Sequence, residues 1–177
     1  MRKRHGLAIR LAVILLFIMS GIGYMTYMPD DSWPGPLHPL ADVEQRSADR
    51  LRRHVDVLAG EIGERNVGHP DALLAAAGYI RDTLVAEGYA VTGQSFSSRG
   101  MDVENLEVEL PGSRLPDEII LVGAHYDSVT GSPGANDNGS GVAAVLEIAR
   151  LLAGEDLPRT VRLVAFVNEE PPFFYSE

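Results

Sequence analysis

The chain has 177 residues, of which 45% are hydrophobic, enough for one α/β domain of modest size with an apolar core. Its formal net charge is −10, although four of its 15 basic residues lie within the first ten positions. The acidic remainder would repel a nucleic-acid backbone, so DNA and RNA are excluded as partners. The absence of cysteine excludes disulfides, thiolate metal sites and a cysteine nucleophile.

The N-terminus combines basic residues with a long apolar run. Four basic residues precede residues 11–28, an uncharged run of 18 residues, about the shortest length that spans a bilayer as a helix. Basic residues before the run and acidic residues after it favour a cytoplasmic N-terminus and an exported body. We therefore expect residues 1–28 to form a basic tip and a transmembrane anchor, with the body on the extracytoplasmic side, in the cell envelope or periplasm. A cleaved signal peptide, which would make the body secreted, and a buried soluble helix are the alternatives.

The next segments divide the chain into a linker and a body. Residues 29–40 contain several prolines and a glycine and have no apolar period, so they predict an extended linker. The body, residues 41–177, begins with two helical patterns. The apolar positions predict one helix over 41–60 and a second over 70–88, which has a proline in its first turn and a glycine at its end.

The centre of the body predicts strands and one further helix. Strands are expected near residues 90–96, 103–110 and 119–123, and the continuously apolar third one is typical of a central buried strand. A glycine-rich loop, a helix over 140–153 and a last strand, VRLVAFV, follow. Strand, helix and strand with short links predict a right-handed parallel crossover. We expect an α/β fold with a mixed, mainly parallel sheet flanked by helices.

Polar side chains follow two of these strands. His125 and Asp127 come directly after a strand, two residues apart, so they point the same way on an extended backbone. Asp137 lies in the next loop and would return to the same edge, while Glu169 and Glu170 end the last strand. Ligands gather at the carboxyl ends of parallel strands, so we expect one shared site there.

The residue types at this edge favour a divalent metal. One imidazole with several carboxylates suits zinc, which makes a bound water nucleophilic, and a carboxylate that does not ligate can take the proton of that water. Each of these features alone has a plain structural interpretation. The His125 and Asp127 pair can be structural, the glycine-rich loop can be only a turn, and paired glutamates at a strand end can be a solvated face. Their order on consecutive strands of one α/β unit favours the metal site. These arguments leave open which of Glu169 and Glu170 is the ligand and which is the base.

Three segments, AHYDS, GANDNGSGVAAVLEIARLL and VAFVNEE, closely resemble the zinc aminopeptidases of peptidase family M28. That family removes N-terminal residues from peptides with two adjacent zinc ions. The upstream segment GERNVGHPDALLAAAGYIRDTLVAEGY is also similar, so the resemblance runs from about residue 41 to 170. It implies a zinc-exopeptidase-like fold of the phosphorylase/hydrolase-like architecture and a peptide substrate.

The resemblance also implies a role for each polar residue at this edge. His125 would bind one zinc, Asp137 would bridge both ions, and Glu170 would ligate a zinc. Glu169 would be the general base on the bridging water, and Asp127 would be the carboxylate behind His125. By these correspondences the catalytic residues are Glu169 and Asp127, and the metal ligands are His125, Asp137 and Glu170.

The chain departs from the family pattern in two places. Asn138 follows the bridging residue where the family often has a second Asp, a mild change because this position is not a ligand. A further Asp and a further His complete the two zinc spheres in the family, whereas here no His follows His125. We therefore expect the chain to be the N-terminal part of a longer enzyme, an incomplete form of the aminopeptidase.

Three other functions are weighed against this one. A membrane-anchored, non-catalytic binding domain of M28-like fold is the main alternative, and glutaminyl cyclase chemistry on the same scaffold is another. A serine hydrolase built from Ser140, His125 and Asp127 is disfavoured because no G-x-S-x-G elbow surrounds the serine.

Overall fold

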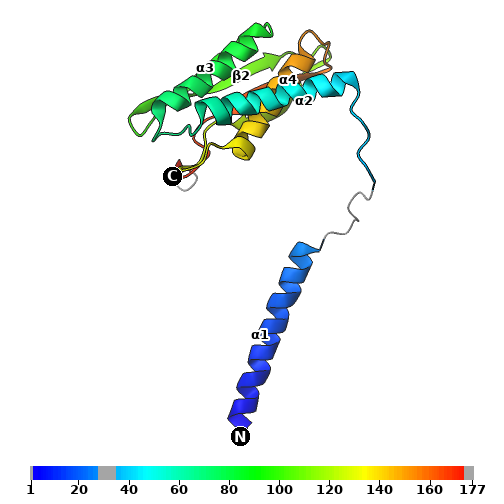
Figure 1. The fold of residues 1–177 in the computed structure, drawn as a ribbon, viewed down its shortest axis with the longest axis vertical. Coiled ribbons are helices and arrows are strands. Elements are labelled where there is room, and N and C mark those ends of the chain that lie inside the picture. Colours follow the sequence, from blue (N-terminus) through cyan, green and yellow to red (C-terminus); the bar gives the residue numbers. More distant parts are fainter. Residues whose placement is uncertain (1, 28–34, 174–177) are drawn as a thin grey trace. The chain divides into compact units, whose positions relative to one another are not determined.

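The structure is a computed structural model that describes residues 2–27 and 35–173 (Figure 1). The chain divides into two compact units, Met1–Pro39 and Leu40–Glu177. The predicted site residues all lie in the second unit.

The first unit contains helix α1 (Arg2–Thr26). Its described apolar side chains are exposed, including Phe17 and Met25. Within the described ranges, no helix has the length and apolarity that a membrane crossing needs, so the anchor predicted over residues 11–28 is not confirmed. Residue 28 and most of the predicted linker, residues 29–34, lie outside the described residues.

The second unit has three α-helices and two short π-helical segments in its described part. They are α2 (Asp42–Val55), η1 (Asp56–Ile62), α3 (Pro70–Ala86), η2 (Ala135–Gly139) and α4 (Ser140–Leu152). The first turn of α2 is closed by Glu44, whose carboxylate accepts a hydrogen bond from the N–H of Ala41 at 2.7 Å. The helix predicted over 41–60 is therefore two segments, α2 and η1, and η1 ends before Gly63, whose φ is 81°.

The sheet has four described strands in the order β1-β2-β4-β3. Their bounds are β1 (Thr92–Ser98), β2 (Met101–Leu110), β3 (Leu115–His125) and β4 (Arg159–Phe166). The parallel connection of the predicted crossover is confirmed, because β3 and β4 are parallel and α4 lies between them in the chain. The sheet is mixed, as expected, but the described strands are not mainly parallel. β1 pairs with β2, and β2 with β4, in antiparallel fashion, and the short turn at Arg99 and Gly100 allows no other pairing of β1 and β2.

The core lies between the sheet and the helices. Helices α3 and α4 contact the sheet and each other, and α2 packs on α4 as an outer layer (Figure 1). Side chains from the sheet, α3, α4 and η1 are almost completely buried, including Leu58, Leu73, Leu106, Leu146 and Leu163. Burying such side chains stabilises the fold by about 1.5 to 3 kcal/mol each. This packing fixes the carboxyl ends of β3 and β4 side by side.

Strand β3 differs from the prediction of a central buried strand. It lies at one edge of the described sheet, and Ile119, Ile120 and Leu121 are 50%, 47% and 57% exposed. The apolar run led to the wrong prediction because composition reports what a strand can bury, not where it lies in the strand order. Only the end of β3 is well covered, with Ala124 and His125 6% and 9% exposed.

Candidate metal centre

Three of the predicted residues meet where β3 and β4 end. His125 is the last residue of β3 and pairs in register with Phe166, so the segment after β4 passes beside its imidazole. That segment carries Glu169 and Glu170. The ligand atoms offered by His125, Glu169 and Glu170 all lie within 4.8 Å of one another. The parallel pairing of the two strands therefore creates the cluster.

Asp137 reaches the same place from the loop before α4. Its Oδ1 lies 3.1 Å from Nε2 of His125, while three quarters of its side chain is exposed. The approach depends on Gly134, which has a left-handed φ of 58° and whose Cβ, if present, would lie 2.7 Å from the carbonyl oxygen of Asp137. The loop can thus close only with glycine at that position. The peptide bond between Asp137 and Asn138 is cis.

Asp127 lies behind His125 and is 2% exposed. Nδ1 of His125 is 3.2 Å from the Asp127 carbonyl oxygen and 3.6 Å from its carboxylate. The carboxylate oxygens instead accept hydrogen bonds from the N–H groups of Glu169, at 3.2 Å, and Glu170, at 3.0 Å. Asp127 therefore joins the end of β3 to the segment after β4, a contact that the sequence did not predict.

The charges around the imidazole favour a cation. Contact with Asp127 raises the pKa of His125 to about 9 against the opposing effect of burial, and Glu169 and Asp137 add to the rise. Burial alone would raise the pKa of Asp127, but the nearby His125 imidazole and hydrogen bonds from the N–H groups of Glu170 and Glu169 lower it. Four carboxylates thus surround one imidazole, and a bound divalent cation would offset their mutual repulsion.

The two glutamates have different surroundings. The side chain of Glu169 is 48% exposed, whereas Glu170 is 8% exposed and its Oε1 is buried without a hydrogen-bond partner among the described residues. Burial raises the pKa of Glu170, and the charge of Asp137 adds to the rise. A buried, unpartnered carboxylate oxygen is costly unless a cation contacts it. The residues present therefore fit a metal such as zinc, with Glu170 as the more suitable ligand of the two.

Arg65, which no sequence pattern singled out, is completely buried beside this centre. Its guanidinium donates to the carbonyl oxygens of Tyr126, at 2.6 Å, and Gly134, at 2.9 Å. Arginine is almost never fully buried without partners, and here the partners are backbone carbonyls. The only signal in the sequence was an arginine within a glycine-bounded loop, GERNVG, which does not distinguish it from a solvated residue.

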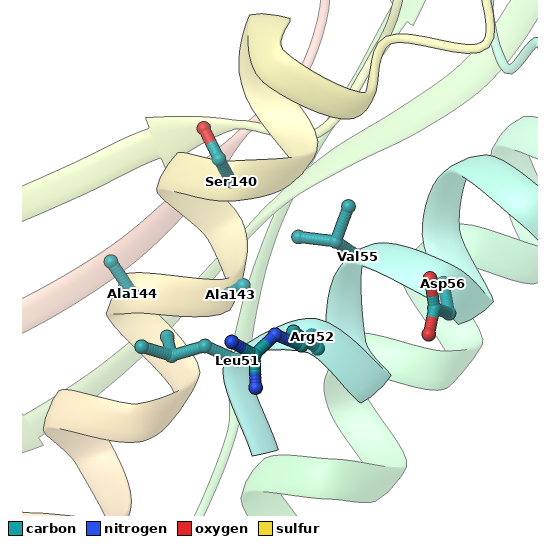
Figure 2. A pocket seen from close by; sticks show the side chains of 7 residues that line it. All are labelled: Leu51, Arg52, Val55, Asp56, Ser140, Ala143 and Ala144. Atoms are coloured by element: carbon teal, nitrogen blue, oxygen red, sulfur yellow. The ribbon is translucent and has the colours of Figure 1, made fainter. Parts of the chain in front are cut away.

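Ser140 does not form the serine hydrolase arrangement. Its hydroxyl donates to the carbonyl oxygen of Asn136 at 2.8 Å, and Nε2 of His125 contacts Asp137 instead. Ser140 borders a separate, open hollow of about 410 Å³ (Figure 2). This hollow is lined by residues of α2, the start of η1 and α4, namely Leu51, Arg52, Val55, Asp56, Ser140, Ala143 and Ala144. None of them is a predicted metal or catalytic residue.

Comparison with known proteins finds one family. The model of peptidase family M28 matches residues 105–176, which include every predicted site residue. In these residues the chain resembles peptidase family M28. It is 35% identical over 175 residues to the uncharacterized protein YfbL of Escherichia coli K12, covering 94% of this chain and 52% of YfbL. It is also 37% identical over 125 residues to leupeptin-inactivating enzyme 1 of Streptomyces exfoliatus, covering 71% of this chain and 27% of that enzyme. The chain thus spans about half or less of the length of these relatives.

Solved structures show the same fold. BSAP, a zinc aminopeptidase from Bacillus subtilis, matches with a TM-score of 0.58 at 17% identity, over 67% of this chain and 61% of that one. The glutaminyl cyclase of Porphyromonas gingivalis matches with a TM-score of 0.55 at 27% identity, over 70% of this chain and 44% of that one. This chain therefore shares its mixed sheet with flanking helices with BSAP and with this glutaminyl cyclase.

Proposed function

We propose that this chain carries metal ligands and the catalytic base of a zinc-dependent aminopeptidase. The observation that carries the proposal is the convergence of His125, Glu169 and Glu170, whose ligand atoms lie within 4.8 Å of one another at the ends of two parallel strands. Resemblance to a peptidase family supports peptide-bond hydrolysis, and the names of the zinc aminopeptidase and metalloprotease relatives support zinc. The substrate is then the N-terminal residue of a peptide.

In this proposal three residues hold zinc. His125 offers Nε2, Glu170 offers its buried unpartnered oxygen, and Asp137 offers the carboxylate that lies 3.1 Å from the imidazole. Asp137 is the most exposed of the three, which supports its assignment as the residue shared with a second ion. Asp127 fixes the position of His125 and of the segment that carries Glu170.

Glu169 is the proposed general base. Zinc, when bound, would acidify a water and polarise the scissile carbonyl. The half-exposed carboxylate of Glu169 lies beside the ligands yet is free to face substrate, so it can accept a proton from that water and deliver it to the leaving amine. Its backbone N–H is fixed by Asp127, which limits how far the carboxylate can move.

Two isosteric substitutions test the separate roles. In Glu170→Gln the full chain should bind zinc about 10-fold to 100-fold more weakly, because a charged ligand is lost. In Glu169→Gln it should keep its zinc but lose hydrolysis of an aminoacyl chromogenic substrate. Glu155→Gln, at an exposed position outside the site, is the matched control. Equal zinc affinities in Glu169→Gln and Glu170→Gln would contradict the assignment.

The same preparation separates the alternatives. Glutaminyl cyclase chemistry is favoured by the 27% identity to the Porphyromonas gingivalis enzyme, and it predicts cyclisation of an N-terminal glutaminyl peptide with no release of amino acids. A non-catalytic binding domain predicts neither reaction in a sample that retains its metal. Release of the N-terminal residue by a metal-loaded sample supports the aminopeptidase.

We also propose that the body lies outside the cytoplasm, either tethered through the N-terminal segment or released after cleavage. Support comes from the basic residues before the apolar run of residues 11–28 and the acidic residues after it. A reporter that is active only outside the cytoplasm, fused after Glu177, tests this location. Activity that disappears when residues 1–28 are deleted would agree with it, whereas an inactive fusion that accumulates in the cytoplasm would contradict it.

A further inference from the structure

Arg65 joins segments that are distant in the sequence. It lies in the loop between η1 and α3, and all five hydrogen bonds that its guanidinium makes within the described chain go to backbone carbonyls. Two of the acceptors, Leu58 and Gly63, belong to η1 and the residue that ends it. The other three lie between β3 and α4. A planar guanidinium is the side chain that can donate to so many acceptors at once.

The three distant acceptors lie near the two ends of one loop. Tyr126 directly follows His125, and its carbonyl oxygen accepts from Nε of Arg65 at 2.6 Å. Pro133 and Gly134 precede Asp137, and their carbonyl oxygens accept from Nη1 and Nη2. A single side chain therefore ties the residue after one proposed ligand to the residues before another.

The main chain of Arg65 reinforces this contact through Ser128, near the start of the same loop. The N–H of Arg65 donates to the Ser128 hydroxyl at 3.1 Å, and the N–H of Ser128 donates to the Arg65 carbonyl at 2.9 Å. The Ser128 hydroxyl in turn donates to the carbonyl of Ser132 at 2.9 Å. The loop between the two proposed ligands is thus held at both ends, and Ser128 links its first part to Ser132.

The approach of Asp137 to His125 needs such a tie. Asp137 is exposed and stands on a loop of glycine and small polar residues, so little side-chain packing holds it. Its distance of 3.1 Å from Nε2 of His125 is set by how the loop returns. If the loop were freed at either end, Asp137 and His125 would be apart in many of the molecules. Metal affinity would then fall in proportion to the fraction of molecules in which the loop is closed.

We infer that Arg65 is a positioning residue for the metal centre, acting by closing the loop between His125 and Asp137. The inference rests on the proposed function, since it concerns how the proposed ligands are brought together. It assigns Arg65 no contact with metal or substrate. The side chain is completely buried, so it acts only through the carbonyls that it holds.

The test measures the affinity of the metal-free full chain for Zn²⁺ by calorimetry and for Co²⁺ by visible absorption. Arg65→Met removes all five N–H donors of the guanidinium while keeping a side chain of similar length. Arg65→Lys keeps the positive charge but lacks the planar guanidinium that donates in several directions. Arg81→Met is the control, because Arg81 is partly buried and pairs with Glu104 at 2.7 Å between α3 and β2, away from the loop that Arg65 holds. Unfolding midpoints are recorded for every variant, and affinities are measured where all remain folded.

Arg65→Met should bind both ions at least about 10-fold more weakly than the unaltered chain, with Arg65→Lys between the two. Arg81→Met should lower the unfolding midpoint without changing affinity, which is also what a purely structural role of Arg65 would produce. A folded Arg65→Met with an affinity within two-fold of the unaltered chain would overturn the inference.

Ser128→Ala decides the matter if both Arg65 variants fail to fold. It removes the hydroxyl that receives the Arg65 N–H, and should weaken binding about three-fold, with a smaller loss of stability than the Arg65 variants suffer because one hydrogen-bonding group is removed rather than five donors. Unchanged affinity in Ser128→Ala would then overturn the inference. If the unaltered chain itself binds neither ion, the proposed function fails and the inference fails with it. If the unaltered chain and every variant bind the ions equally well, only the inference about Arg65 fails.

Discussion

Replacing Asp127 by asparagine should both destabilise the fold and weaken the metal centre. Its carboxylate accepts two backbone hydrogen bonds, from Glu169 at 3.2 Å and Glu170 at 3.0 Å, in a side chain that is 3% exposed. A hydrogen bond to a charged group contributes about 1.5 to 3 kcal/mol, and a buried donor left without an acceptor costs about 1 to 3 kcal/mol. Asparagine keeps one oxygen but places an NH₂ group opposite the second N–H. We therefore expect a loss of about 3 kcal/mol in the free energy of unfolding.

Urea unfolding of the full chain, followed by circular dichroism, measures this loss. Asp117→Asn is the control, because Asp117 lies on β3, the strand that ends just before Asp127, but is exposed, and it should change stability by less than about 0.5 kcal/mol. Zinc affinity should also fall by about 10-fold to 100-fold in Asp127→Asn, since the segment that carries Glu170 loses its tether. A loss of stability below about 1 kcal/mol, equal to that of the control, would refute the proposed tie between β3 and the segment after β4.

Two further predictions concern the surrounding scaffold. Hydrogen bonding to Arg150 lowers the pKa of Glu147 to about 2. The ionised Glu147 carboxylate therefore contributes its full stabilisation of the fold above the ordinary pKa near 4.5, and this stabilisation is lost as the pH falls through 2. The stability difference between the unaltered chain and Glu147→Gln should therefore be about 2 to 3 kcal/mol at pH 6 and shrink below pH 4, as urea unfolding against pH will show. Gly134→Ala should cost about 2 kcal/mol or more, because φ is 58° and the new Cβ would lie 2.6 Å from that of Ser128. Gly154→Ala, with φ of 79° but nothing within 4 Å, should cost only about 1 kcal/mol, and equal thermal unfolding shifts in the two variants would contradict the steric argument.

Local patterns predicted most of the elements and where the site would form. The crossover from β3 through α4 to β4 followed from two apolar strands with a helix between them, and it brings His125 close to Glu169 and Glu170. The position of the candidate site at the strand ends depends only on that topology. The strand order was not predictable in the same way, because apolar composition made β3 look central when it lies at an edge.

The contacts that hold the candidate site together could not be predicted, because they depend on tertiary structure. The burial of Arg65 requires carbonyl groups from Leu58 to Gly134 to converge on one guanidinium, and nothing in its neighbours along the chain shows this. The different exposure of Glu169 and Glu170 likewise depends on how the chain turns after β4, so the residues alone left the ligand and the base interchangeable. The individual roles of these residues remain predictions that the substitutions above test.

Zinc titration of the metal-free full chain and of His125→Ala tests the central claim most directly. The account predicts saturable binding to the unaltered chain, with release of protons as the imidazole loses its own, and a loss of at least about 10-fold in affinity when His125 is removed. Saturable binding of equal strength in both proteins, or no saturable binding to the unaltered chain, would contradict a metal centre at the ends of β3 and β4.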